Sequence, residues 1–441
     1  MIIPLTNSHI HVFDAECAPG NFLRVIPSKF VRKYPKSIKW LLERKPMRKT
    51  IWWLDGKVNG KTRKKRKKLA KYISFLNMAT QTSQIEIFSK ALEIAKIHDS
   101  SARLVGLTLD MDYMDDNRAP DKKFCTQLSE VKQIKKYFPD HFFPFVSVDP
   151  RARSGNILLN WIKKYFEYGL ISKTSGKAYP YFSGIKIYPA LGFFPFDPGL
   201  DEIYQYAEAN GIPVMYHCTR VGSLYVGRNI ESLIPAKPKM IMPGKDSPKY
   251  PDALHAQQEI YERINRYYGE KVWIKNSNTG NNDLACDLFS HPQNYVPLMC
   301  KYPKLKICLA HMGGDDEIEY MKAEDRKKSS GDEDREKIWE VDGYNWAELI
   351  RDLMKKHDSL YTDISFSLSD LDNSKVAANI NEWLEAKDDK GEKLGKRILF
   401  GTDFYMTEQQ KGEAELYTLA KKHLGEWFDK ISRENSSRYL Y

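Results

Sequence analysis

The sequence lacks the features that place a protein in a membrane or in an oxidising compartment. It has six cysteines in 441 residues, and no two of them form a Cys-x-x-Cys pair. That density is far below the density of a disulfide scaffold, so we expect reduced thiols. No apolar run approaches the roughly 18 residues that a membrane helix needs. Met1 leads into the first expected strand without the basic segment and longer apolar stretch of a signal peptide. These absences predict a cytoplasmic protein with no membrane partner.

Negative charge is also in deficit, and the positive excess is concentrated in one segment. The formal net charge is +11, and seven of the eight residues from 61 to 68 (KTRKKRKK) are Lys or Arg. Such a block can attract phosphate groups. No aromatic platform or nucleic-acid motif accompanies it, so a solvated face or a lid segment is the simpler interpretation. A nucleic-acid-associated protein that uses residues 61–68 is therefore a distant alternative.

What the sequence does have is a pair of histidines at its start. Side chains at positions i and i+2 of a strand share one face, so His9 and His11 would point the same way. The neighbouring Ile10, Val12 and Phe13 favour a buried strand. Two imidazoles on one side of a strand make half of a metal site. A bare His-x-His also occurs by coincidence, with histidines that are only hydrogen-bonded at a strand end, so the other ligands must come from the rest of the chain.

Helical and strand-like segments alternate beyond residue 76. Seven more strands are expected, over residues 104–109, 142–148, 182–188, 213–217, 305–311, 360–364 and 397–401. Helices are expected over residues 81–98, 128–138, 157–168, 200–210, 253–268, 346–356, 376–386 and 408–424. Alternation of this kind implies parallel strands joined by crossover helices, and eight such strands predict an α/β fold, a single (β/α)8 TIM barrel. We expect one domain over residues 1–441, with long loop insertions at about 19–76, 218–282 and 313–337.

Four further polar residues stand at or just beyond the ends of the expected strands. They are Lys186, His217, His311 and Asp403. Active sites of such barrels form at this rim. Neutral imidazoles and a carboxylate suit Zn²⁺ and other divalent first-row ions, and an open coordination position can lower the pKa of a bound water to about 7. The alternatives are ordinary strand-end histidines and, for Asp403, a helix N-cap.

The ordered set of rim residues resembles a known family. Its local sequences are GIKIYP at 184–189, LAHMGG at 309–314 and FGTD at 400–403. Together with the histidine pair they resemble the amidohydrolase superfamily, in particular the amidohydrolase-related branch. That branch includes aminocarboxymuconate-semialdehyde decarboxylase, related non-oxidative decarboxylases and dicarboxylate lactonases. The resemblance spans nearly the whole barrel but neither of the two longest insertions.

The resemblance implies a metal site and a role for each rim residue. The implied ligands of one divalent ion are His9, His11, His217 and Asp403. Zn²⁺ is the preferred ion, with Mn²⁺ or Fe²⁺ as alternatives. Asp403 would also take a proton from water, and His311 would hydrogen-bond that water or polarise a substrate oxygen, a task for a group that titrates near neutrality.

Two cationic residues are candidates for binding the substrate. By strand parity Lys186 would face the barrel interior, where an unpaired ammonium is costly. We expect it to hold a substrate carboxylate or to pair with an acidic neighbour, and a second metal ion only if this lysine is carboxylated, as in two-metal members of the superfamily. Arg220, three residues beyond His217, could also hold an anionic group, with a solvated loop arginine as the alternative.

These observations predict a metal-dependent hydrolase that cleaves a small amide, ester or lactone through metal-activated water. The expected partner is a small-molecule substrate that carries a carboxylate. The alternative on the same fold is a metal-dependent non-oxidative decarboxylase (carboxy-lyase) of an unsaturated or aromatic acid. A catalytically silent barrel that serves as a binding scaffold is a more distant interpretation.

Overall fold

The computed structural model describes residues 3–21, 83–116, 118–220, 222–270, 282–322 and 343–441. An eight-stranded sheet dominates these residues, and every ladder in it is parallel. Its strands are β1 (Thr6–His11), β2 (Arg103–Leu107), β3 (Phe145–Ser147), β6 (Gly184–Ile187), β7 (Val214–Tyr216), β8 (Ile307–Leu309), β9 (Leu360–Asp363) and β10 (Ile398–Leu399). Neighbours in the sheet are also neighbours among these strands in the chain.

Backbone hydrogen bonds join the two ends of this sheet. Ser8 N donates to Phe400 O at 2.8 Å, and Asp403 N donates to His9 O at 2.9 Å. Ile10 and Phe404 add an isolated parallel bridge. The strands therefore close into a barrel, as predicted, and we call the join between β1 and residues 400–404 the seam.

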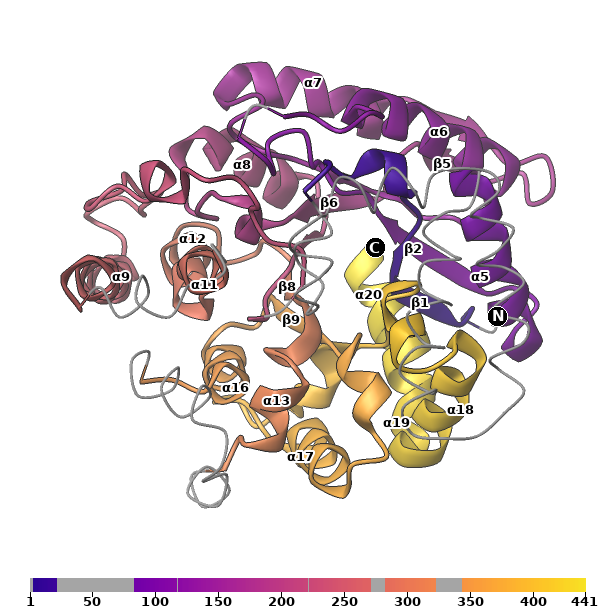
Figure 1. Ribbon diagram of the computed structural model, residues 1–441. Coiled ribbons are helices and arrows are strands. Elements are labelled where there is room, and N and C mark those ends of the chain that lie inside the picture. The colour runs from indigo at the N-terminus through magenta and orange to yellow at the C-terminus, as the bar shows by residue number, and fades with distance from the viewer. Residues whose placement is uncertain (1–2, 22–82, 117, 221, 271–281, 323–342) are drawn as a thin grey trace.

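Helices surround the strands (Figure 1). They are α5 (Gln84–His98), α6 (Phe124–Tyr137), α7 (Gly155–Glu167), α8 (Asp201–Ala209), α9 (Tyr250–Glu270), α11 (Asp283–Ser290), α12 (Val296–Lys301), α13 (Asp315–Glu319), α16 (Trp346–Lys356), α17 (Ser374–Glu385), α18 (Glu413–Leu424), α19 (Glu426–Asp429) and α20 (Asn435–Leu440). Among these helices of the described residues, none is long and apolar enough to cross a membrane.

Helix α16 illustrates why these segments are helical. Its buried residues Trp346, Ile350 and Met354 recur at helical spacing and face the core. The side chain of Asn345 accepts a hydrogen bond from Glu348 N at 2.9 Å and caps the first turn. Lysines in the last turn complement the partial negative charge at the helix end.

The barrel has an apolar interior of its own, separate from the layer between strands and helices. Side chains of six barrel strands meet two residues of α20 there, together with three residues outside the barrel strands (Phe143, Tyr179 and Ala310). The cluster comprises Val105, Leu107, Phe143, Phe145, Tyr179, Met215, Cys308, Ala310, Tyr361, Leu399, Tyr439 and Leu440. The C-terminal end of the chain accordingly lies near the middle of the ring of strands in Figure 1. The polar rim residues therefore lie above this buried apolar cluster, which we call the floor of the barrel.

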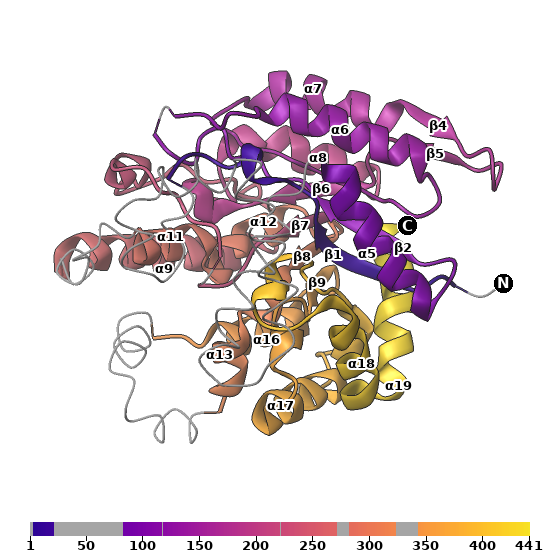
Figure 2. The same cartoon turned by 45° about the vertical axis from the view of Figure 1, so that its right-hand side comes forward.

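The expected strands and helices are present, with several differences. An antiparallel hairpin, β4 (Gly169–Ile171) and β5 (Ala178–Pro180), was not expected and lies at the outer edge of the molecule (Figure 2). The helix expected from residue 408 begins at Glu413, because Met406–Gln409 form a 3-10 turn. The chain also continues helical to Leu440, beyond the expected end at residue 424.

The insertions are described only in part. Helix α9 confirms the helix expected within 218–282. Helix α13 starts the 313–337 segment, and the remainder of that segment lies outside the described residues. Apart from residues 19–21, the 19–76 insertion lies outside them too, and so does the basic block at 61–68.

Candidate metal centre and active site

Strand β1 places both histidines of the N-terminal pair on the inner rim of the barrel. Every residue of this strand is buried. His9 Nδ1 lies 2.9 Å from Asp363 Oδ2, and His11 Nδ1 lies 3.2 Å from Leu107 O on the neighbouring strand. Each ring is thus held through its Nδ1 atom and directs its Nε2 atom away from that partner.

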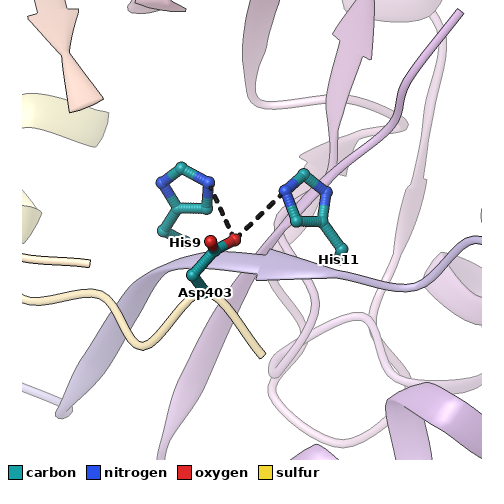
Figure 3. A group of neighbouring side chains, drawn as sticks. All are labelled: His9, His11 and Asp403. Carbon is teal, nitrogen blue, oxygen red and sulfur yellow. Dashed lines mark ion pairs between the residues drawn. The ribbon is translucent and has the colours of Figure 1, made fainter. Parts of the chain in front are cut away.

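Asp403 reaches the same point from the other side of the seam. Its carboxylate Oδ1 lies 3.2 Å from His11 Nε2 and 3.5 Å from His9 Nε2 (Figure 3). Asp403 has a left-handed φ of 58°, which turns the chain toward β1. A Cβ on Gly401 would lie 2.7 Å from His9 Cβ, so only glycine lets this segment approach so closely.

The chemistry of these three atoms fits a cation. A carboxylate and a carbonyl only accept hydrogen bonds, so a neutral imidazole that keeps either of these contacts carries its proton on Nδ1 and a lone pair on Nε2. His9 Nε2 and Asp403 Oδ1 are buried and make no hydrogen bond to any of the described residues. Three lone-pair donors therefore converge, and His9, His11 and Asp403 form a group whose ligand atoms all lie within 4.8 Å of one another. The three lone pairs repel one another, whereas a divalent ion among them would be coordinated by all three atoms.

The electrostatics keep these groups in the protonation states that ligands need. Burial lowers the pKa of His9 to about 3, with Lys186 adding to the effect against the opposing charge of Asp363. Burial alone would raise the pKa of Asp403, but the histidines around it bring that pKa below its usual value. His9 is therefore a neutral imidazole and Asp403 a carboxylate at neutral pH.

His217 and His311 lie together on the rim. His217 Nδ1 is 3.2 Å from His311 Nε2, and the His217 ring stacks on Tyr188 with the centroids 4.1 Å apart. Burial lowers the pKa of His311. His217 belongs to neither of the ligand groups found among the described residues. The structure thus brings His217 next to His311, outside the group formed by His9, His11 and Asp403.

Asp363 is the site residue that sequence reasoning missed. It ends β9, the same strand-end position that drew attention to His217 and His311, but it carries no motif of its own. With His9 and His311 it forms a second possible ligand group. Ser365 Oγ occupies the middle of that group, 3.0 Å from His9 Nδ1 and 2.9 Å from His311 Nδ1, and it also contacts Asp363 Oδ1. This second group is therefore a hydrogen-bonded cluster rather than a second cation site.

Lys186 lies in the same interior. Its side chain is fully buried, and within the described part of the chain Nζ makes no hydrogen bond. Burial lowers its pKa to about 8, against the opposing charges of Asp363 and Asp403. The lysine is thus an electrostatic neighbour of both site carboxylates.

Arg220 is already engaged by other side chains. Its Nε lies 2.9 Å from Glu317 Oε1, and its NH1 lies 3.3 Å from Asp287 Oδ2. The guanidinium also lies over the Trp346 ring, 4.3 Å from its centroid. Arg220 is consequently not a solvated loop residue, and its contacts favour a structural role that ties its loop to α11 and α13.

Comparison with known families identifies the class of protein that this barrel and rim define. A family model described as amidohydrolase matches residues 177–440, more than half of the chain. The chain therefore belongs to this amidohydrolase family, and it is an enzyme of hydrolase or carboxy-lyase type. The family membership inferred from the rim residues is confirmed.

Solved structures with similar architecture were also found. An uncharacterised TIM-barrel protein from Bordetella bronchiseptica is 12% identical with a TM-score of 0.44, covering 99% of this chain and 98% of its own. A 5-carboxyvanillate decarboxylase from Sphingomonas paucimobilis is 10% identical (TM-score 0.39, coverage 77% and 78%). A probable 2-pyrone-4,6-dicarboxylic acid hydrolase from Acinetobacter baumannii is 11% identical (TM-score 0.39, coverage 81% and 88%). No curated protein matches the sequence.

Proposed function

We propose that this chain is a metal-dependent hydrolase of a small amide, ester or lactone that carries a carboxylate. The observation that carries the proposal is the convergence of His9 Nε2, His11 Nε2 and Asp403 Oδ1 within one buried group at the rim. Mixed nitrogen and oxygen donors suit Zn²⁺ best, with Mn²⁺ and Fe²⁺ as alternatives. One ion is proposed, because Ser365 Oγ fills the second group.

Each rim residue has a role in this proposal. His9, His11 and Asp403 would hold the ion, and His217 is proposed as the remaining protein ligand. When bound, the ion would polarise a carbonyl and make water a better nucleophile at neutral pH.

The remaining steps belong to the chain's own residues. The Asp403 carboxylate would accept a proton and return it to the leaving group. His311 would hydrogen-bond the attacking water or polarise a substrate oxygen. Lys186 would offset the negative charge of the substrate carboxylate in the buried interior. Non-oxidative decarboxylation is equally compatible with the family, and the products decide between the two reactions.

The test combines metal analysis with product detection. Elemental analysis of the purified protein is expected to give about one divalent ion per chain. Carboxylate-bearing esters, lactones and amides, together with unsaturated and aromatic acids, would be assayed for both hydrolysis and CO₂ release. Hydrolysis without CO₂ supports the proposal, and CO₂ release identifies the carboxy-lyase instead.

Variants assign the result to the site. His9→Ala and Asp403→Ala are expected to lose the ion and at least about 100-fold in kcat/KM, because each removes a ligand. His255→Ala, an exposed histidine on α9, serves as the matched control and is expected to retain both. Full metal content and activity in either ligand variant would refute the proposed site.

A further inference from the structure

The protonation of the rim histidines can be traced to acceptors that the fold fixes in place. His9 Nδ1 faces the Asp363 carboxylate at 2.9 Å, and His311 Nδ1 faces the Ser365 carbonyl at 3.1 Å. Neither partner can donate a hydrogen bond as a carboxylate or a carbonyl. The Ser365 hydroxyl also lies near both Nδ1 atoms, but it donates its proton to Asp363 Oδ1 and can only accept from them. Both Nδ1 atoms must therefore hold the ring proton.

The effect extends to a third histidine. Because His311 carries its proton on Nδ1, its Nε2 atom is an acceptor. His217 Nδ1, 3.2 Å from that atom, must then be the donor. His217 Nε2 is left as a lone pair, which is the state that a metal ligand requires.

The orientation of Asp363 is itself fixed by the backbone. Its Oδ1 atom accepts hydrogen bonds from His311 N and Ser365 N, each at 3.0 Å. These amides can only donate, so an acceptor must occupy the Oδ1 position. The Oδ2 atom alone faces His9, and the side chain is completely buried.

We propose that Asp363 is a positioning residue that selects the Nδ1–H tautomer of His9, while the Ser365 carbonyl independently selects that of His311 and, through it, that of His217. The consequence for metal binding rests on the proposed function, but the tautomers themselves do not. Asp363 contacts no reacting atom in this scheme and acts through His9 alone.

The substitution Asp363→Asn tests the proposal sharply because the backbone dictates how the amide must lie. Its carbonyl oxygen has to take the Oδ1 position against the two N–H donors, so its NH₂ group faces His9 Nδ1. A donor at that place forces the ring proton of His9 onto Nε2, where it blocks coordination. The tautomers of His311 and His217 are expected to stay unchanged, since the Ser365 carbonyl is still present.

The experiment uses the full chain labelled with ¹⁵N-histidine, after removal of metal by chelation. Long-range ¹H–¹⁵N spectra distinguish the two tautomers, and His9→Gln assigns the His9 signals. Wild type is expected to show His9 as Nδ1–H, and Asp363→Asn as Nε2–H. Ser365→Ala removes the hydroxyl but neither the carbonyl nor Asp363, so it is expected to keep all three tautomers.

A matched control separates the tautomer from the loss of a buried charge. Asp149 is a buried aspartate just beyond β3 that pairs with Arg151, Nε to Oδ1 2.9 Å, and touches none of these histidines in any described contact. Asp149→Asn is expected to leave His9 as Nδ1–H. Titration with Co²⁺, followed by its visible spectrum, is expected to show about 10–100-fold weaker binding for Asp363→Asn only.

Two outcomes would overturn the inference. One is a His9 signal of the Nε2–H type in the metal-free wild type, a result that needs no variant to fold. The other is an unchanged His9 tautomer in folded Asp363→Asn. Failure of the proposed function looks different: wild type would show the expected tautomers and yet bind no Co²⁺.

Discussion

A buried hydrogen-bond network lies directly behind the candidate metal ligands. Asn7 Nδ2 donates to Thr402 Oγ1 at 2.8 Å and to Glu413 Oε1 at 3.2 Å, and Thr402 Oγ1 donates to the same Glu413 oxygen at 2.8 Å. Asn7 and Thr402 flank His9 and Asp403 in the sequence. The network thus ties the two sides of the seam together at the residue scale.

Glu413 makes the stability of the protein depend on pH. Burial raises its pKa to about 8, so the folded chain keeps this proton at neutral pH. Between about pH 4.5 and pH 8 the unfolded chain has lost the proton that the folded chain retains, so the contribution of Glu413 to the free energy of unfolding falls as pH rises. Glu413→Gln mimics the neutral acid and removes this titration.

Denaturant unfolding of Glu413→Gln and wild type at several pH values would measure this effect. The variant is expected to gain stability relative to wild type as pH rises from 5 to 8.5. Glu415→Gln, two residues along α18 at an exposed position, is the control and should show a constant difference. Parallel stability curves for Glu413→Gln and wild type would contradict the prediction.

At the scale of elements, helix α20 closes the floor of the barrel. Tyr439 is 1% exposed, and its ring lies 5.0 Å from the Tyr361 ring, centroid to centroid. Its hydroxyl is buried without a hydrogen bond to the described residues. Tyr439→Ala is therefore expected to cost about 3–5 kcal/mol of unfolding free energy through the cavity it leaves.

The conservative variant separates packing from polarity at this position. Tyr439→Phe keeps the ring and removes an unsatisfied hydroxyl, so it is expected to be neutral or slightly stabilising. Both variants would be compared with wild type by thermal and denaturant unfolding. Equal destabilisation by the two variants would show that the hydroxyl, rather than the ring, supports the floor.

Elements with a strong local pattern could be predicted from the sequence. Most of the barrel strands are apolar runs that stop at polar residues or turns, with the mostly polar β1 as an exception, and α16 has a complete amphipathic stripe. Two kinds of feature had no such signal. The packing of α20 in the barrel interior depends on contacts with strands far away in the chain. The role of Asp363 depends on its contact with His9, which is 354 residues away.

The candidate site likewise contains residues that the sequence could indicate and contacts that it could not. Strand-end position was enough to select His9, His11, His311 and Asp403, because the carboxyl ends of parallel strands meet at one rim. It could not reveal that Arg220 would pair with Glu317 and Asp287, since those partners come from helices α13 and α11. Which acidic side chains reach Arg220 is decided by the tertiary structure.

At the scale of the whole molecule, the site spans the closure of the barrel. His9 and His11 come from the first strand, and Asp403 follows the last one. The family match at residues 177–440 includes Asp403 but not the histidine pair. The two ends of the chain must therefore fold into one barrel before the proposed ligands meet.

An ion bound there would bridge the seam and stabilise only the closed barrel. Because the unfolded chain separates the ligands, metal at 100 times its Kd should add about 2.7 kcal/mol to the free energy of unfolding. Differential scanning calorimetry with added Zn²⁺ or with chelator is expected to show a higher Tm with the ion. His11→Ala should fold but lose this shift, whereas His255→Ala should keep it. If His11→Ala kept the full shift, the stabilising ion would lie elsewhere and the seam would not be its site.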